Sequence, residues 1–161
     1  VTMPLSNCEV GGGVAPVTEM LERGMAVGLG TDGYVNNFFE VMRGAFLIHK
    51  AHRQDPQAMP AKTVYRMATE MGARALGLEE TGTLEAGKAA DVIAIALDTP
   101  TPINEHNVYD QLVLFRGPAD VTDVMAAGRW LKREGRILTI DPSAARERLR
   151  AAAESFWNPQ R

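Results

Sequence analysis

Asp32 stands directly after a short apolar run of mostly small residues, residues 25–30, in the sequence Thr31-Asp32-Gly33. Such a run is typical of a buried strand, so we expect the carboxylate at the C-terminal end of that strand. In barrels of parallel strands, catalytic groups gather at this rim. A carboxylate there can bind a divalent metal ion and accept a proton from a metal-bound water. An ordinary turn is the alternative, because Asp-Gly is among the commonest turn dipeptides.

A second polar pair, Ser6 and Asn7, follows Pro4, and Asn7 lies 25 residues before Asp32. Proline restricts the local backbone, and the hydroxyl and amide groups offer donors and acceptors to the polar edge of a substrate. An ordinary turn with Asn7 in the left-handed conformation is the alternative. The residues by themselves leave both interpretations open.

The elements that must position these residues follow from periodicity and turn residues. Residues 1–14 are expected to form a short strand end followed by a loop, and residues 25–30 a buried strand. Apolar residues at helical spacing and the flanking glycines and prolines predict helices over residues 17–23, 38–53 and 61–76. This order is typical of parallel βα units.

After residue 78 the sequence becomes rich in turns and β-branched residues. Strands are expected over residues 91–97, 112–115, 121–126, 130–132 and 137–140. Residues 127–128 and 134–135 read as hairpin turns. A charged, alanine-rich helix over residues 143–156 closes the chain, with Ser143 as its N-cap. We therefore predict an α/β part over residues 1–78 and a β-rich part with a terminal helix over residues 79–161.

Composition narrows the class of protein. The chain is 45% hydrophobic and 23% charged, as in a soluble globular protein, and it is long enough for a real core. Its 17 basic and 20 acidic residues are spread evenly, so nucleic acid is not an expected partner. No apolar segment reaches the length of a membrane span, and no signal peptide is recognisable. The single cysteine, Cys8, excludes an internal disulfide and fits the cytoplasm.

Several motifs, in this order, resemble the amidohydrolase superfamily. They are Pro4-Leu5-Ser6-Asn7, the glycines at 11–13, residues 15–17, residues 24–33 and the aromatic-acidic start of the next helix. Residues 82–93 are similar to the segment with which these chains leave their barrel, and residues 121–140 to their closing strand pair. The nearest resemblance is to the deaminases and chlorohydrolases grouped with cytosine, guanine and S-adenosylhomocysteine/methylthioadenosine deaminases.

This resemblance implies the C-terminal part of a TIM-like (β/α)8 barrel, its last two strands with their helices. Strands of a small composite β-sandwich and a terminal helix would follow. It implies one zinc or iron ion in the complete protein, with Asp32 as metal ligand and proton carrier. Asn7 and Ser6 would lie near a small-molecule substrate. The implied reaction is hydrolytic deamination of a nucleobase-like ring by metal-activated water.

The chain departs from the family's pattern. It has no His-x-His pair, and its three histidines, His49, His52 and His106, are interpreted as surface or packing residues. Thr2 stands where the family often has histidine. By resemblance the remaining metal ligands, the general acid and the first six strands lie upstream of Val1. We therefore expect a C-terminal fragment that is inactive alone and that associates with itself or with the missing part of the barrel.

Two other functions remain open. One is a hydrolase of the same architecture with another leaving group, such as a chlorohydrolase or an enzyme acting on a cyclic amide. The other is a non-catalytic interaction module, because half a barrel would expose strand edges that need a partner.

Overall fold

The structure, a computed structural model, describes residues 1–33 and 36–158. Its helices are α1 (Pro4–Glu9), α2 (Val17–Glu22), α3 (Phe38–Arg53), α4 (Ala61–Ala68), α5 (Glu70–Ala75), α6 (Val108–Phe115) and α7 (Pro142–Trp157), with a short 3-10 helix at Pro118–Asp120. Its strands are β1 (Val92–Ile95), β2 (Val121–Ala126), β3 (Arg129–Arg133) and β4 (Arg136–Ile137). No helix in this described part is long and apolar enough to cross a membrane.

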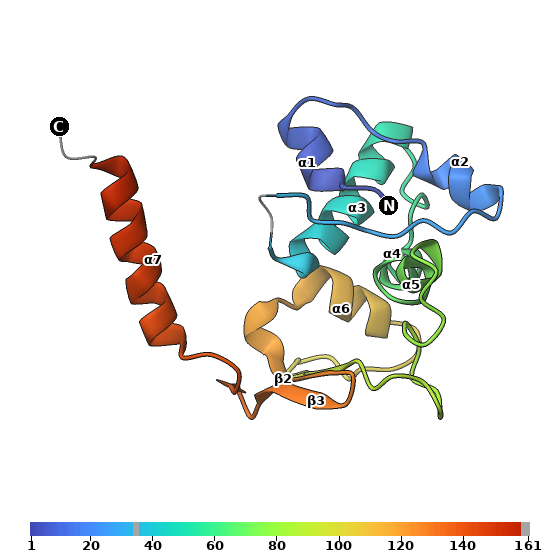
Figure 1. The fold of residues 1–161 in the computed structure, drawn as a ribbon. Coiled ribbons are helices and arrows are strands. Elements are labelled where there is room, and N and C mark those ends of the chain that lie inside the picture. Colours follow the sequence, from blue (N-terminus) through green and yellow to red (C-terminus); the bar gives the residue numbers. More distant parts are fainter. Residues whose placement is uncertain (34–35, 159–161) are drawn as a thin grey trace.

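The N-terminal part combines extended segments with helices (Figure 1). Thr2 forms a parallel bridge with Leu29, in which the Thr2 amide donates to the Gly28 carbonyl and the Gly30 amide donates to the Thr2 carbonyl, both at 2.9 Å. This isolated bridge is parallel, as expected for βα units, but neither segment forms a regular strand there. Within the described residues, the predicted strand over residues 25–30 pairs with another extended segment only at this bridge.

The loop expected before residue 14 is partly wrong, because α1 begins at Pro4 and includes Ser6 and Asn7. Proline is favourable at the first helical position, where its missing N–H costs no hydrogen bond. The helix α2 agrees with the predicted one and is followed by Gly24 at φ +74°, a conformation that suits glycine.

The long helix α3 has the predicted bounds, residues 38–53. The Asn37 side chain caps it by accepting from the Phe39 amide at 3.2 Å, and it ends at Gln54 with φ +53°. Val41 and Ala45 are almost fully buried on its inner face, as the helical spacing predicted. The core that they enter also holds Val17 and Val64.

The single helix predicted over residues 61–76 is wrong, because the chain breaks at Thr69 into α4 and α5. Thr69 has φ −125° and ψ −103°, and its hydroxyl donates to the Tyr65 carbonyl at 2.9 Å. Such side-chain bonds to a carbonyl four residues back compete with regular helix and bend it. The predicted inner face is confirmed at Val64 and Met67, which are fully buried.

The strand predicted over residues 112–115 is also wrong, because these residues form the second half of α6. A short apolar run does not distinguish a buried helix from a buried strand. Tertiary packing decides here: α6 lies against α3 and α4, and Val113 is fully buried in their core. The Tyr65 and Tyr109 rings, with centroids 5.2 Å apart, join α4 to α6.

The remaining strands form one antiparallel sheet in the order β1-β2-β3-β4. Both predicted hairpin turns are confirmed: Ala127-Gly128 and Glu134-Gly135 all have positive φ, as tight hairpins require. The strand predicted over residues 137–140 is shorter and forms the two-residue β4. Ile95 and Val121 pack against the helical core, so the sheet lies on the α6 side of the molecule (Figure 1).

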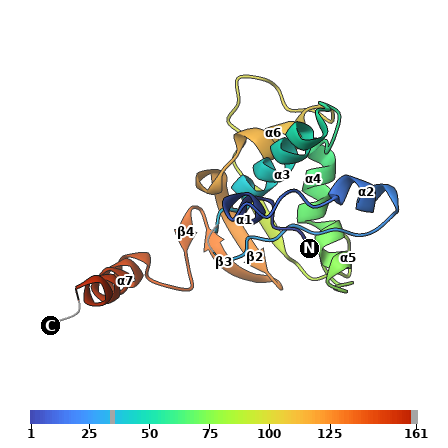
Figure 2. The same cartoon turned by 90° about the horizontal axis from the view of Figure 1, so that it is seen from above.

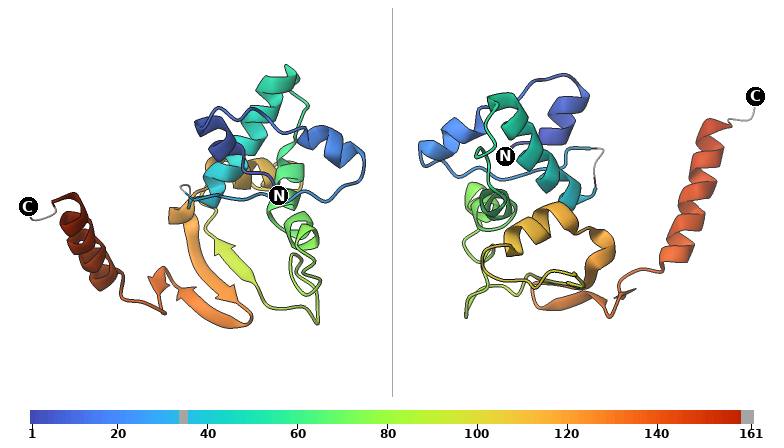
Figure 3. Two further views of the ribbon diagram at one scale, coloured as in Figure 1. Left: turned by 45° about the horizontal axis from the view of Figure 1, so that its top comes forward. Right: turned by 180° about the vertical axis from the view of Figure 1, so that it is seen from behind.

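The terminal helix α7 stands apart from the rest of the chain, as Figures 2 and 3 show from several directions. None of its residues is buried. Its N-cap is Asp141, whose carboxylate accepts from the Ser143 and Ala144 amides at 2.9 and 3.2 Å. The prediction of Ser143 as N-cap is therefore wrong by two residues, because Pro142 starts the helix one position before it.

Gly28 is expected to be intolerant of any side chain. A Cβ at this buried position would lie 2.9 Å from the Gly72 Cα, so neither backbone could yield easily. Overpacking of this kind costs about 1–3 kcal/mol. Urea unfolding of Gly28→Ala should show that loss, whereas Gly117→Ala, whose Cβ would meet nothing within 4 Å, should unfold close to the parent. Equal midpoints for the parent and Gly28→Ala would contradict the close approach of these two segments.

Candidate functional site

The Asp32 carboxylate is fixed by two donors from different parts of the chain. The Ser6 hydroxyl donates to Oδ2 at 2.6 Å, and the Gly33 amide donates to Oδ1 at 2.7 Å. The donor from α1 therefore reaches the end of the neighbouring extended segment. The Thr2–Leu29 bridge brings the two segments together, since α1 starts two residues after Thr2 and Asp32 lies three residues after Leu29.

These two donors hold the pKa of Asp32 below its usual value, with the Ser6 hydroxyl as the larger cause and the Gly33 amide as the second. Hydrogen bonds to the charged form stabilise that form. The carboxylate is therefore ionised at neutral pH. It is also exposed, so a metal ion or a substrate can reach it.

The backbone of Asp32 lies in the left-handed region at φ +56°. Residues other than glycine adopt this conformation infrequently, and the surrounding structure must hold them there. The Ser6 bond is one such restraint, because it ties the side chain of Asp32 to a buried residue of α1. The sequence pattern around Asp32 predicted a special position, and the structure supplies the reason for its geometry.

Ser6 and Asn7 occupy consecutive positions of α1 and face different neighbours. Ser6 is buried, and its hydroxyl points to Asp32. Asn7 is half-buried and lines a small cavity together with Thr2 and His49. Among the described residues no hydrogen bond joins the Asn7 side chain to Asp32. The structure thus brings Ser6 to the predicted metal ligand, while substrate binding by either residue stays a prediction.

The described residues contain no group of three or more His, Cys, Asp and Glu side chains that could hold a metal ion. His49 is buried in α3, whereas His52 and His106 are exposed. Asp32 by itself fits one position of a metal site: it is anionic, exposed, and retains lone pairs beyond the two hydrogen bonds. Among these residues it has no second ligand beside it, so the chain offers one ligand rather than a complete metal centre.

Two features of this region escaped prediction from the sequence. The sequence pattern identified Ser6 and Asp32 as separate candidate site residues. It did not predict the hydrogen bond between them, because that bond depends on the direction of α1. It also gave no reason to place His49 beside Asn7, since 42 residues separate them along the chain. The helical spacing gave only a weak indication that His49 is buried. His49 follows Val41 and Ala45 at intervals of four residues on the inner face of α3.

Removal of the Ser6 hydroxyl is expected to raise the pKa of Asp32 toward its usual value, because the larger of its two stabilising donors is lost. A carboxylate whose pKa is lowered by folding stabilises the fold above its unfolded pKa, and this stability disappears as the pH falls through the folded pKa. Ser6→Ala should therefore lose part of the acid-side dependence of stability. Carbon-13 NMR titration of the Asp32 carboxyl group measures the shift directly.

Ser143→Ala is the matched control, because Ser143 is exposed at the start of α7 and its amide, rather than its hydroxyl, bonds to Asp141. It should leave the Asp32 titration unchanged. A titration curve of Asp32 that is identical in Ser6→Ala and the parent would show that the hydroxyl does not hold the carboxylate.

Comparisons with known proteins identify the class. A profile described as the amidohydrolase family matches residues 1–131 of the chain, which includes the Asp32 site. The chain belongs to this family. The resemblance inferred from the sequence motifs is therefore confirmed.

Several similar curated proteins are deaminases. The chain is 44% identical over 143 residues to the 5-methylthioadenosine/S-adenosylhomocysteine deaminase of Desulforudis audaxviator, covering 86% of this chain and 33% of that protein. It is 40% identical over 157 residues to the 5'-deoxyadenosine deaminase of Methanosarcina mazei, covering 95% of this chain and 36% of that protein. The chain thus spans about a third of the length of the curated relatives that it matches.

Solved structures give the same assignment. An adenosine deaminase from Xanthomonas campestris with bound zinc matches with a TM-score of 0.87 at 30% identity, over 94% of this chain and 36% of that chain. The zinc complex of the atrazine chlorohydrolase TrzN from Arthrobacter aurescens matches with a TM-score of 0.74 at 29% identity, over 90% of this chain and 33% of that chain. The fold of the chain therefore matches about a third of each of these two structures.

Proposed function

We propose that the chain is the C-terminal part of a metal-dependent aminohydrolase that deaminates an adenosine-like compound. The observation that carries the proposal is the Asp32 carboxylate, which is exposed, ionised and fixed by Ser6 and Gly33 three residues after the Leu29 bridge. The names of the most similar relatives support a purine nucleoside or nucleoside thioether as substrate, since they act on methylthioadenosine, S-adenosylhomocysteine and deoxyadenosine.

Zinc is the proposed metal, because two similar solved structures contain it. A zinc ion supplies a water molecule whose pKa is lowered to near neutrality, and therefore a nucleophile at neutral pH. Asp32 would be one ligand. Its free lone pairs also allow it to accept a proton during attack on the ring carbon that carries the amino group, and to return that proton to the departing ammonia.

The other ligands must come from outside these residues, because the described part of the chain offers only Asp32 to the site. Two features of the fold also support the proposal that the metal site is incomplete in this chain. The Thr2–Leu29 bridge is a minimal parallel pair, and large apolar side chains such as Val1, Met25, Leu76 and Leu78 are exposed. Large exposed apolar side chains such as these are ones that a covering segment would bury. We propose that the remaining barrel strands cover it.

Metal content and activity test this proposal in two forms of the protein. The 161-residue chain alone is expected to bind no stoichiometric zinc and to release no ammonia from methylthioadenosine. A fusion of the N-terminal two thirds of the Desulforudis audaxviator deaminase to this chain is expected to bind one zinc ion and to deaminate. Stoichiometric zinc in the isolated chain, or a folded fusion without zinc, would overturn the proposal.

A hydrolase with another leaving group is the second candidate, and the similarity to the atrazine chlorohydrolase favours it. The two reactions differ in their released product, which is ammonia for deamination and chloride for dechlorination. The same fusion assayed with atrazine for chloride release separates them. Deamination is favoured because the curated relatives at 44% and 40% identity are deaminases.

A further inference from the structure

His49 is a buried titratable residue that the proposed reaction does not use. Its exposed fraction is 2%, and it lies on the inner face of α3. Among the described residues its ring forms no hydrogen bond with another protein group. Its ring nitrogens are not among the fully buried side-chain atoms that lack a partner, so they keep contact with accessible space where a water molecule can bind.

The ring borders a small cavity between α3 and α1. The cavity is lined by Thr2, Pro4, Asn7, Gly13, Val14, Ala15, Ile48 and His49. It has room for about one water molecule, and Thr2, Asn7 and His49 give it polar groups on several sides, which is what a buried water requires. His49 and Asn7 therefore line the same small, partly open cavity beside α1, the helix that carries Ser6.

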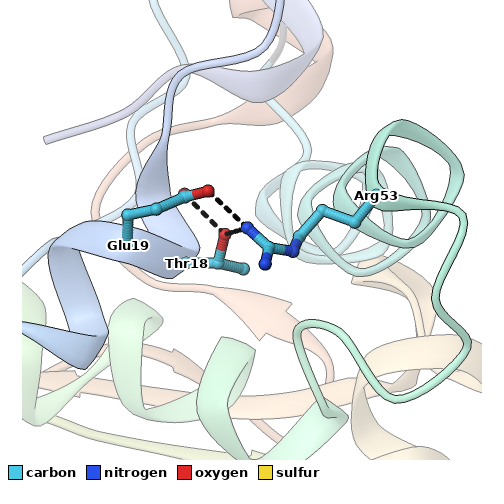
Figure 4. Close-up of polar contacts among 3 residues, drawn as sticks. All are labelled: Thr18, Glu19 and Arg53. Atoms are coloured by element: carbon cyan, nitrogen blue, oxygen red, sulfur yellow. Dashed lines mark hydrogen bonds and ion pairs between the residues drawn. The ribbon is translucent and has the colours of Figure 1, made fainter.

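The charged groups around His49 are few. No other titratable side chain lines the cavity, since α1 and residues 13–15 contribute only uncharged groups to it. On its own helix Lys50, His52 and Arg53 lie within one turn of His49, and α2 contributes Glu19. Figure 4 shows that Glu19 already pairs with Arg53, while Thr18 donates to Glu19 at 2.8 Å and accepts from Arg53 at 3.1 Å.

This environment favours the neutral ring. Burial is the largest cause that lowers the pKa of His49, repulsion by His52 adds to it, and Glu19 opposes both. Because Glu19 is engaged by Arg53, its attraction for a protonated ring is weakened. A proton on His49 would place a charge against the uncharged wall of the cavity.

We infer that His49 is a positioning residue for α1, and that the neutral ring holds the Asn7 side of this helix through the shared cavity. A water molecule that bridges the ring and the Asn7 side chain is the simplest link. Protonation of His49 would loosen α1, and with it the restraint that Ser6 places on Asp32. The effect on α1 is independent of the proposed reaction, and only its consequence for catalysis rests on the proposed function.

The direction of the pH effect follows from linkage. A histidine whose pKa is lowered by folding takes up a proton more readily when its surroundings open, so acid favours the open state. The contribution of His49 is complete above its unfolded pKa and is lost as the pH falls below it. The helix α1 should therefore be well ordered at neutral pH and progressively less protected in mildly acidic solution.

Amide hydrogen exchange of the 161-residue chain tests this inference without any activity measurement. The reporters are the amides of Asn7, Val10 and Gly12, which donate to the carbonyls of Met3, Ser6 and Asn7. Their protection factors, corrected for intrinsic exchange, are expected to fall several-fold between about pH 7.5 and about pH 5.5. In His49→Gln, which keeps hydrogen-bonding groups but does not titrate, they should stay constant over this range.

His52→Gln is the matched control, since His52 lies one turn away on the same helix but is exposed. It should keep a pH-dependent protection of α1, with its midpoint at a somewhat higher pH because the repulsion of His49 by His52 is removed. If His49→Gln does not fold, NMR titration of the parent chain tests the inference instead. The midpoint of the His49 ring titration must then coincide with the midpoint of the pH-dependent shifts of the α1 amides. Protection of α1 that does not change with pH, or the same pH response in His49→Gln, would overturn the inference. A fusion protein that binds no zinc or has no activity would contradict the proposed function and would leave the inference about His49 and α1 unaffected.

Discussion

Asparagine in place of Asp32 is expected to remove the metal ion and at least about a thousandfold of kcat/KM from the fusion enzyme. The amide has nearly the size and shape of the carboxylate, so Ser6 can still donate to its oxygen and the fold should persist. The amide carries no negative charge for the metal and cannot accept the proton that the reaction must transfer. Elemental analysis for zinc and the rate of ammonia release measure the two losses separately.

Asp123→Asn is the matched control for this substitution. Asp123 is a half-buried aspartate whose pKa is lowered by a hydroxyl, that of Thr122, and by a backbone amide, that of Glu134, but it lies in the antiparallel sheet. It should retain zinc and activity. A fusion that keeps stoichiometric zinc and its rate after Asp32→Asn would exclude Asp32 as metal ligand and proton carrier, even if the family assignment stands.

The sequence predicted those elements whose local signals agree with their packing. The helix α3 is an example: the apolar spacing provides the buried face, and the structure has the predicted bounds. The Ala127-Gly128 turn is another, because its positive φ values are specific to tight hairpins. Where a local sequence pattern is compatible with only one conformation, the sequence alone is sufficient to predict the element.

Prediction failed where tertiary contacts choose between conformations that are locally equivalent. The run at residues 112–115 suits a strand, but it forms a helix because Val113 then enters the core between α3 and α4. The break at Thr69 depends on a side-chain bond to Tyr65 that no periodicity reveals. Asp32 shows the same difference. Its position after a predicted strand marked it as a candidate metal ligand, but its hydrogen bond to Ser6 depends on how α1 is oriented, which the sequence does not show.

The position of α6 also explains how the two predicted parts of the chain are held together. Arg43 of α3 donates from Nε to the Leu114 carbonyl and from a terminal nitrogen to the Arg116 carbonyl, each at 3.1 Å. These acceptors lie at the C-terminal end of α6, where carbonyls lack helical partners and a cation is favourable. Arg43 thus fixes the end of α6 on α3, close to the point where the chain turns toward β2.

Arg43→Met is therefore expected to destabilise the chain by about 2–3 kcal/mol, since methionine keeps part of the apolar stem but leaves both carbonyls without their charged donor. The lower urea midpoint should accompany faster amide exchange in α6. Arg66→Met is the matched control: Arg66 forms an exposed i,i+4 ion pair with Glu70, and such pairs contribute only about 0.5 kcal/mol. Equal losses in the two variants would mean that α6 is held by its apolar face alone, and that Arg43 does not couple the helical part to the sheet.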